Sequence, residues 1–281
     1  MKYYIVDAFT SEPFGGNPAG VVLLGQDQPF PDERLMVQVA AELRYSETAF
    51  VQPNGPQEFT VRYFTPRSEV DLCGHATIAT FGVLCQEGII AAGTTCLNHT
   101  LAGDLSVQAG PQVMMQMAPP RAIDTPVDAP LLRHIMSSDD SMLPIEIIST
   151  GLPDIIMPVD NLSQLNALHP DMDALAALSK ELGVVGVHAF TLSDDGFTAH
   201  ARNFAPLYGV PEESATGTAN AALTHYLLRQ GIIPAGSECR FMQGEAMGRP
   251  SVVATTVDDR GSDIWVGGCC RCVAKGELLV S

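Results

Sequence analysis

Short runs in which hydrophobic and polar residues alternate recur along the chain, and this period of two predicts β-strands. The clearest run is 58–65, EFTVRYFT, and segments rich in glycine, proline and asparagine separate several of the runs. Further strands are predicted at residues 3–9, 19–24, 46–53, 112–120, 145–149, 154–159, 188–193, 197–204 and 265–280.

Four segments favour helices instead. Residues 32–42 and 173–182 have one apolar face, as surface helices do, and Asp32 is the predicted N-cap of the first. Residues 76–87 and 218–230 are apolar on almost every side, which predicts helices that are buried on most sides. A curled, mostly antiparallel sheet would bury such a helix, so each half of the chain is expected to be a barrel-like α+β unit rather than a doubly wound one.

The two buried helices belong to a sequence repeat. Each copy opens Arg-x-Phe-x-Pro, continues to Gly, one polar residue and Ala, and reads Gly-Ile-Ile fourteen residues after that first glycine. The copies begin at Arg62, with Gly74 and Gly88, and at Arg202, with Gly217 and Gly231. An internal duplication with pseudo-symmetric domains is therefore predicted.

The Pro/Asp-rich stretch around 118–130 is the expected domain boundary, which gives an N-terminal domain over 1–118 and a C-terminal domain over 119–281. The last strand, at about 270–281, is either part of the C-terminal domain or crosses back to the first domain.

Composition narrows the function classes. The 281 residues are 46% hydrophobic, enough for one large core or two medium ones. The net charge of −17 argues against nucleic acid and membrane surfaces as partners. No apolar leader opens the chain and no run approaches the length of a membrane span, so a cytoplasmic location is expected.

The seven cysteines are expected to be reduced thiols. Cys269, Cys270 and Cys272 lie in a run with strand periodicity and have no second Cys/His pair at zinc spacing, so strand cysteines are favoured over a metal site. The histidines at 99, 134, 169, 188, 200 and 225 likewise have no metal-ligand spacing. No cofactor motif is present either, so neither a metal nor a cofactor is expected.

Candidate chemistry concentrates where the two buried helices begin. The first amides of a helix have no internal partner, and a glycine there lets a carboxylate approach them closely. Gly74, Gly217 and Thr218 are therefore candidate substrate-binding residues, together with the adjacent Cys73 and Thr216. The alternative is that the glycines only serve tight turns. Two such entries predict a small carboxylate as the substrate.

A proton carrier is also expected. Glu47 heads an apolar strand, where burial would raise its pKa; the alternative is a solvated strand-edge glutamate. His75 and Glu213 stand beside the two helix entries, with structural and capping roles as their alternatives. Cys73 precedes Gly74 and is either a reactive thiolate or a small buried residue.

Together these segments resemble the PhzF-like family of the diaminopimelate-epimerase-like superfamily. The resemblance rests on four motifs in order, with a closing strand after them: VDAFTSEPFGGNPAGVVL, SETAFV, RYFTPRSEVDLCGHAT, RNFAPLYGVPEESATGTANAAL and VGGCCRCVAKGELLV. It implies two domains, each a curled sheet around a central helix, and a homodimer.

The resemblance also implies an activity and its residues. Isomerases of this family move a proton within trans-2,3-dihydro-3-hydroxyanthranilate to give its keto form. The glutamate that moves the proton corresponds to Glu47. Gly74 and His75 match the family's substrate-binding Gly-His. Where the family commonly has Asp-Pro-Ala-Thr-Gly-Ser, this chain has Glu213-Ser214-Ala215-Thr216-Gly217-Thr218, so the carboxylate, Thr216 and a hydroxyl are retained.

The primary hypothesis is a cofactor-independent isomerase of a small cyclic or amino carboxylic acid, with Glu47 as general acid/base. One alternative is an amino-acid epimerase that uses Cys73, although the second helix entry offers no matching cysteine. Another is a member of the family that binds a metabolite or a protein without catalysis.

Overall fold

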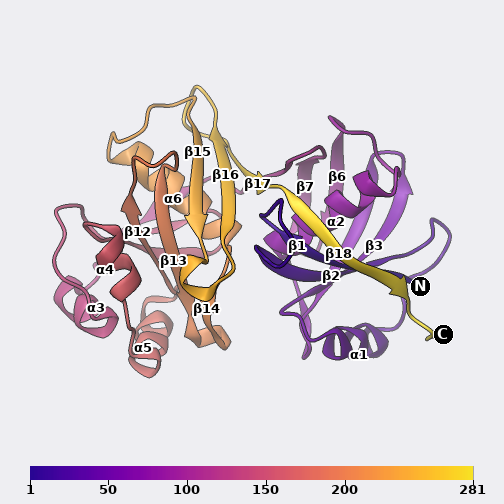
Figure 1. Ribbon diagram of the computed structural model, residues 1–281, viewed down its shortest axis with the longest axis horizontal. Coiled ribbons are helices and arrows are strands. Elements are labelled where there is room, and N and C mark those ends of the chain that lie inside the picture. The colour runs from indigo at the N-terminus through magenta and orange to yellow at the C-terminus, as the bar shows by residue number, and fades with distance from the viewer. Residues whose placement is uncertain (281) are drawn as a thin grey trace. The chain divides into compact units, whose positions relative to one another are not determined.

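The computed structural model describes residues 1–280, and the chain divides into two compact units. The first unit contains Met1–Gln116 and the C-terminal segment from Gly267 onward, and the second is Met117–Val266. Each unit has a mixed, mostly antiparallel sheet and a central helix (Figure 1). Among the described residues no helix is both long and apolar enough to cross a membrane.

The sheet of the first unit runs in the order β18-β1-β2-β3-β4-β6-β7-β8, and the short β5 pairs with β4. The β2–β3 and β4–β6 pairs are parallel and the others are antiparallel. The strands are β1 (Lys2–Ala8), β2 (Asn17–Leu23), β3 (Thr48–Gly55), β4 (Glu58–Phe64), β5 (Glu69–Val70), β6 (Thr95–Thr100), β7 (Gly103–Gln108), β8 (Val113–Gln116) and β18 (Cys270–Glu277).

The sheet of the second unit runs in the order β9-β10-β11-β12-β13-β15-β16, and the short β14 pairs with β13. Its β11–β12 and β13–β15 pairs are parallel. The strands are β9 (Arg121–Ile123), β10 (Glu146–Ser149), β11 (Pro153–Pro158), β12 (Val187–Leu192), β13 (Ala199–Ala205), β14 (Val210–Glu213), β15 (Glu238–Gln243) and β16 (Ser251–Val257). β17 (Ile264–Gly268) follows β16 in the chain and contains the boundary between the two units.

The two sheets repeat one pairing order. β1-β2-β3-β4-β6-β7 corresponds to β10-β11-β12-β13-β15-β16, with parallel pairs at the same two steps and the short side strand on the same neighbour. The register agrees as well, because Phe64 faces Thr48 where Phe204 faces Val187. This order is what a duplicated unit produces, and the predicted α+β fold class is confirmed.

A central helix packs on each sheet: α2 (Gly74–Gln86) in the first unit and α6 (Gly217–Arg229) in the second. Nine of the 13 residues of each helix are buried, as the absence of a polar face predicted. Both end at the repeated Gly-Ile-Ile, where Gly88 and Gly231 have φ of 70° and 69°. These left-handed glycines are typical helix C-terminal residues, so this part of the repeat ends a helix.

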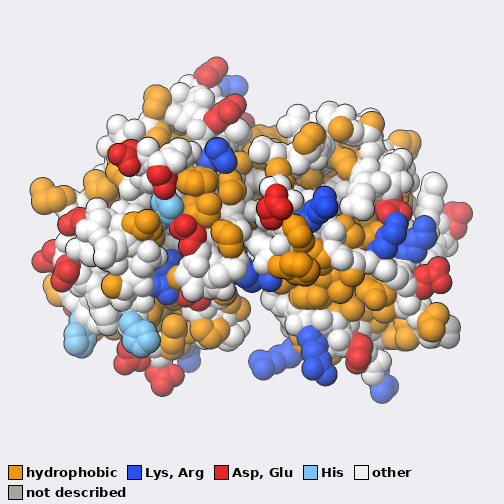
Figure 2. Space-filling view, viewed as in Figure 1, with side chains coloured by type: hydrophobic (Ala, Val, Ile, Leu, Met, Phe, Trp, Pro, Cys, Tyr) orange, Lys and Arg blue, Asp and Glu red, His pale blue; other side chains and the backbone are white. Residues whose placement is uncertain are grey.

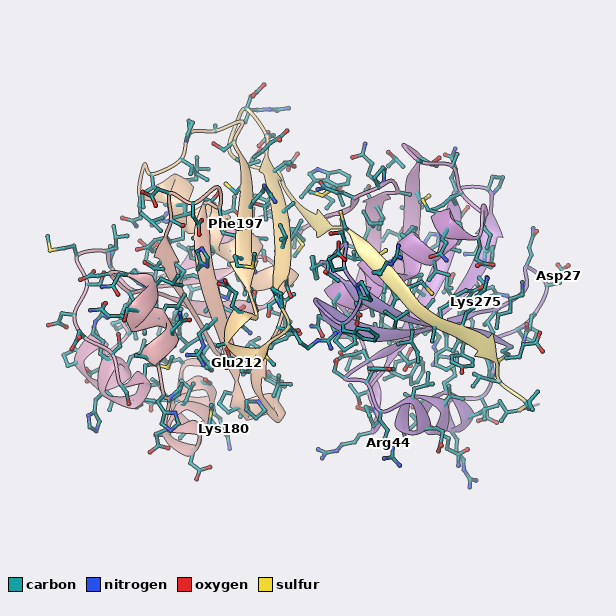
Figure 3. The ribbon with its side chains drawn as sticks, in the orientation of Figure 1. Asp27, Arg44, Lys180, Phe197, Glu212 and Lys275 are labelled. Carbon is teal, nitrogen blue, oxygen red and sulfur yellow. The ribbon has the colours of Figure 1, made fainter. Side chains whose placement is uncertain are left out.

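The Arg-x-Phe part of the repeat is structural. Arg62 on β4 makes a two-pronged ion pair with Glu69 on β5, at 2.7 and 2.6 Å. Arg202 on β13 does the same with Glu212 on β14, at 2.8 Å for both bonds. Glu212 is labelled in Figure 3. Each guanidinium also lies over the ring of the phenylalanine two residues later. The repeat therefore fastens a short side strand to the sheet in both units.

The remaining helices cover the outer faces of the sheets. α1 (Glu33–Leu43) packs on β3 and β4, and the side chain of Asp32 accepts from the amide of Leu35, which confirms the predicted N-cap. In the second unit, α3 (Ala129–Met136), α4 (Leu162–Ala167) and α5 (Met172–Leu182) enclose an apolar core with the outer face of its sheet. The sequence did not predict α3 or α4, and β9 lies in the stretch expected to be a linker.

Cys270 and Cys272 lie on β18, as the strand prediction required. On the face shown in Figure 2, acidic and basic side chains are interspersed among uncharged surface.

Candidate active site

Three predicted residues come together where α2 begins. Cys73 is the N-cap residue of α2, His75 is its second residue, and Glu47 directly precedes β3. The Oε2 atom of Glu47 lies 3.3 Å from Nε2 of His75, and the Sγ atom of Cys73 lies 3.4 Å from Nδ1 of the same ring. The imidazole therefore contacts both a carboxylate and a thiol.

The imidazole can relay a proton, because in a neutral ring one nitrogen donates a hydrogen bond while the other accepts one. Ser46 Oγ also lies 3.3 Å from Nε2 of His75, so the ring has two partners at that nitrogen. His75 is 5% and Cys73 8% exposed, whereas 21% of the Glu47 side chain is exposed. Of the three groups, the carboxylate is thus the most accessible to a small molecule.

Buried hydrogen bonds hold this end of α2 on the sheet. Thr77 donates its hydroxyl to the carbonyl of Cys73 at 2.7 Å and pairs with the hydroxyl of Tyr63 at 2.7 Å. Asn98 on β6 donates to the same Tyr63 oxygen at 3.1 Å. Burial raises the pKa of Tyr63, so the phenol keeps its proton. The network fixes the backbone from which Cys73 and His75 project.

A second polar cluster surrounds the start of α6. Glu213 ends β14, and Oε2 of its carboxylate accepts the hydroxyl proton of Thr216 at 2.5 Å. Gln243 on β15 accepts from the Thr216 amide at 3.2 Å and donates to the Glu213 carbonyl at 2.8 Å. The hydroxyl of Thr216 is thus engaged by the Glu213 carboxylate. It is less available for direct substrate binding than the sequence suggested.

The predicted amide donors lie in the first turns of the two helices. Gly74 is the first residue of α2, and a Cβ added there would meet Met115 Cε at an ordinary contact distance of 3.8 Å. Packing within the chain therefore does not demand glycine at 74, and access for another molecule remains a reason for it. Gly217 and Thr218 open α6, and the carbonyl of Thr218 accepts from the hydroxyl of Thr150 at 3.0 Å.

The duplication places unlike residues at equivalent positions. The carbonyl of Glu47 accepts from the amide of Gly20 at 3.2 Å, and the carbonyl of Gly186 accepts from that of Ile155 at 3.0 Å. Gly186 is therefore the counterpart of Glu47, and a Cβ there would lie 1.9 Å from the carbonyl oxygen of Phe204. The second unit has no acid at this position and no space for one.

The helix entries differ in the same way. Cys73 and Thr216 are the N-cap residues of α2 and α6, and their carbonyls accept from Thr77 and Asn220 respectively. Thr216 thus stands where the second unit would need a cysteine for a mechanism with one thiol from each unit.

A buried carboxyl that the sequence did not single out belongs to the second unit. Asp154 on β11 is 1% exposed, and its Oδ1 has no hydrogen-bond partner among the described residues. Burial, and secondarily the charge of Glu213, raise the pKa of Asp154 to about 8. This carboxyl therefore holds a proton at neutral pH.

Ser46 and Gln243 were not predicted. Ser46 is adjacent to a predicted site residue, but nothing in its own pattern distinguishes it from other serines. Gln243 ends β15, 27 residues after Thr216 in the sequence, so its contact with the start of α6 depends on the parallel pairing of β13 with β15.

Comparisons with known proteins point to one family. Residues 6–276 match the PhzC-PhzF family model, described as phenazine biosynthesis-like protein. A protein of Deinococcus radiodurans named as an uncharacterized isomerase is 37% identical, over 98% of this chain and 94% of its own. The trans-2,3-dihydro-3-hydroxyanthranilate isomerase of Pseudomonas fluorescens is 32% identical, over 94% of this chain and 92% of its own.

Solved structures support the same fold. The PhzF-family phenazine biosynthesis protein of Bacillus anthracis matches with a TM-score of 0.89 and 28% identity, over 100% of this chain and 99% of its own. A hydroxyproline epimerase of Agrobacterium vitis matches with a TM-score of 0.67 over 99% of this chain and 90% of its own, at 16% identity. The second likeness concerns the fold alone.

Proposed function

The chain belongs to the phenazine biosynthesis-like protein family and is an isomerase, and we propose that it shifts a proton within a small cyclic or amino carboxylic acid without a cofactor. Trans-2,3-dihydro-3-hydroxyanthranilate is the proposed substrate to test first, because a relative named for that reaction is 32% identical over almost the whole chain. The observation that carries the proposal is the contact of Glu47 with His75 at the entry to α2.

Glu47 is the proposed general acid/base. Its carboxylate removes a proton from one carbon of the substrate while the double-bond electrons move along the ring. The resulting carboxylic acid then returns the proton to another carbon, so no atom is gained or lost overall. A positioned acid/base of this kind contributes about 10²–10⁴-fold to the rate.

His75 is the proposed partner of that step. With its Nε2 at 3.3 Å from the carboxylate, a proton on this nitrogen orients Glu47 by a hydrogen bond. The Cys73 thiol contacts the same ring, with its Sγ 3.4 Å from Nδ1 and 3.8 Å from Nε2. The amides of Gly74, Gly217 and Thr218 are the proposed donors to substrate carboxylate groups, since helix N-termini favour anions.

Glu213 is proposed to bind an amino or hydroxyl group of the substrate. The hydrogen bond from Thr216 orients its carboxylate as an acceptor. We also propose a homodimer, which size-exclusion chromatography with light scattering tests. The proposed cytoplasmic location is tested by cell fractionation.

The deciding experiment measures the ultraviolet absorbance of trans-2,3-dihydro-3-hydroxyanthranilate during incubation with wild type, Glu47→Gln and Glu42→Gln. Glu42 is an exposed glutamate of α1 and serves as the matched control. We expect wild type and Glu42→Gln to remove the diene signal, and Glu47→Gln to do so about 10²–10⁴-fold more slowly. Equal rates for all three proteins would refute the role of Glu47, and no turnover by any would reject this substrate.

An epimerase is the second candidate, favoured only by the proximity of the Cys73 thiol to His75. It predicts exchange of the substrate's α-proton with deuterium from the solvent that is lost in Cys73→Ser and retained in Glu47→Gln. Because Thr216 stands at the matching position, a mechanism with one thiol from each unit has no second thiol there. A member that only binds its ligand would show saturable binding and no exchange in any variant.

A further inference from the structure

The entry to α2 joins three kinds of metal ligand. Glu47, Cys73 and His75 supply a carboxylate oxygen, a sulfur and an imidazole nitrogen, and these three atoms all lie within 4.8 Å of one another. Zinc accepts sulfur, nitrogen and carboxylate oxygen as ligands, and in its catalytic-type sites three protein ligands leave the fourth tetrahedral position open.

The carboxylate and the imidazole have the spacing of ligands on one tetrahedral ion. Zinc bond lengths of about 2.3 Å to sulfur and about 2.0–2.2 Å to nitrogen and oxygen put neighbouring ligand atoms about 3.4–3.6 Å apart. Nε2 of His75 lies 3.3 Å from Oε2 of Glu47. Sγ of Cys73 lies 3.4 Å from Nδ1 and 3.8 Å from Nε2, so a rotation of the Cys73 or His75 side chain is needed to bring the sulfur onto an ion at Nε2.

The surroundings also favour a cation. His75 and Cys73 are almost fully buried, so the ion would be held in a medium that strengthens its attraction to a thiolate and a carboxylate. The side chain of Glu47 is 21% exposed, which gives an ion a way in and leaves a coordination position toward that side. The chain's net charge of −17 further favours the approach of cations.

We propose that Glu47, Cys73 and His75 bind one Zn²⁺ ion, and that bound zinc inhibits the isomerase. Binding replaces the proton of the Cys73 thiol, which is released to solvent, and forms Zn–S, Zn–N and Zn–O bonds. The carboxylate lone pair that would take the substrate proton is then occupied by the metal. The inhibitory part of this inference rests on the proposed function, whereas the metal site itself does not.

Other groups in the chain define the controls. His99 contacts Asp104 through Nδ1 at 2.7 Å and Glu58 through Nε2 at 2.8 Å, so its two carboxylates lie at opposite ring nitrogens. Cys272 on β18 is a partly exposed thiol whose Sγ contacts the carbonyl of Ala274. Both are plausible weak metal ligands, and neither belongs to the Glu47 cluster.

The test titrates the purified, reduced full chain with Co²⁺, whose thiolate-to-metal absorption band reports coordination by sulfur, and then displaces Co²⁺ with Zn²⁺. We expect one equivalent of Co²⁺ to bind with this band in wild type, Cys272→Ser and His99→Gln. Cys73→Ser should lose the band. It should also lower Zn²⁺ affinity by more than about 100-fold, since outer-shell partners alone change metal affinity about 10–100-fold. A band that persists in Cys73→Ser, or no stoichiometric binding to wild type, would overturn the site.

A second variant, Glu47→Gln, tests the metal site independently in case Cys73→Ser does not fold. Glu47→Gln keeps the size of the side chain but removes a charged ligand, so Zn²⁺ should bind more weakly while the sulfur band of bound Co²⁺ remains. Turnover without added zinc separates the two proposals. If Zn²⁺ binds but no turnover occurs, only the proposed function fails; if turnover depends on Glu47 but Zn²⁺ does not bind, only the zinc site fails.

Discussion

Glu47 and Gly186 occupy equivalent positions in the two copies of one fold. The carbonyl of each accepts a hydrogen bond from a backbone amide on the matching strand of its own sheet. One copy therefore carries the candidate acid/base, and the other carries a residue without a side chain. The fold is pseudo-symmetric, but the chemistry it can support is not. A mechanism with equivalent acids from both units is excluded by this pair.

Gly186→Ala should destabilise the protein, because the new Cβ would lie 1.9 Å from the carbonyl oxygen of Phe204 and neither backbone can move away easily. Overpacking of this kind costs about 1–3 kcal/mol or more. Urea unfolding followed by circular dichroism measures the loss. Gly25→Ala is the control, since its Cβ would have nearest contacts of 3.7 Å, and it should change the midpoint little. Equal midpoints for the two variants would contradict the packing argument.

Asp154→Asn should change how stability depends on pH. The pKa of Asp154 is about 8 in the folded protein against 3.8 ordinarily, so the folded state keeps this proton to higher pH than the unfolded state does. The free energy of unfolding therefore falls as pH rises from about 4 to about 8, by at most about 1.4 kcal/mol per pH unit from this group.

The neutral amide of Asp154→Asn removes that slope. The variant should gain stability relative to wild type as the pH is raised from 5 to about 8, in urea titrations performed at each pH. Asp27→Asn, on an exposed turn, is the control and should follow the wild-type curve. A difference between Asp154→Asn and wild type that stays constant with pH would show that the carboxyl does not hold its proton.

Arg202→Met should destabilise the protein more than Arg62→Met does. Both arginines pair with a glutamate on a short side strand, but Arg202 also donates to the carbonyls of Leu165 and Leu168 at 3.1 and 3.0 Å. Its side chain is 11% exposed, against 27% for Arg62. We expect a loss of about 3 kcal/mol for Arg202→Met and about 1 kcal/mol for Arg62→Met. Thermal or urea unfolding of the two variants would refute this if the order were reversed.

Glu213→Gln should raise KM for the isomerase substrate, because the amide keeps the hydrogen bond from Thr216 but loses the charge that would attract an amino group. Losing one charge-assisted hydrogen bond of about 1.5–3 kcal/mol corresponds to about 10–150-fold in kcat/KM. Thr216→Val tests the orienting bond separately and should have a smaller effect. An unchanged kcat/KM in both variants would remove Glu213 from the proposed site.

Much of the fold could be predicted because the repeated residues mark backbone features that both units share. The left-handed glycines at 88 and 231 and the paired arginines at 62 and 202 are required by local geometry, so they survive in both copies and reveal them. The helices α3 and α4 were not predicted, since α4 has only six residues and α3 lies beside a proline-rich stretch.

The candidate site was predicted where its residues are close in sequence. Cys73 and His75 flank one glycine, and the motif that contains Glu47 is itself short, so the pattern alone pointed to all three. Asp154 was missed because a single aspartate at the head of an apolar strand resembles a turn residue, and its burial appears only when the second unit is folded. The partners of His99 and Thr216 on neighbouring strands were hidden for the same reason.

β18 has a consequence for biosynthesis. This strand pairs with β1 and belongs to the first unit, yet the ribosome makes it only after the whole second unit has been synthesised. Residues 117–266 are contiguous and can fold as they emerge. Residues 1–116 cannot complete their sheet until β18 is made, so one edge of β1 stays unpaired until then. The first unit thus begins to be synthesised before the second and is completed only after it.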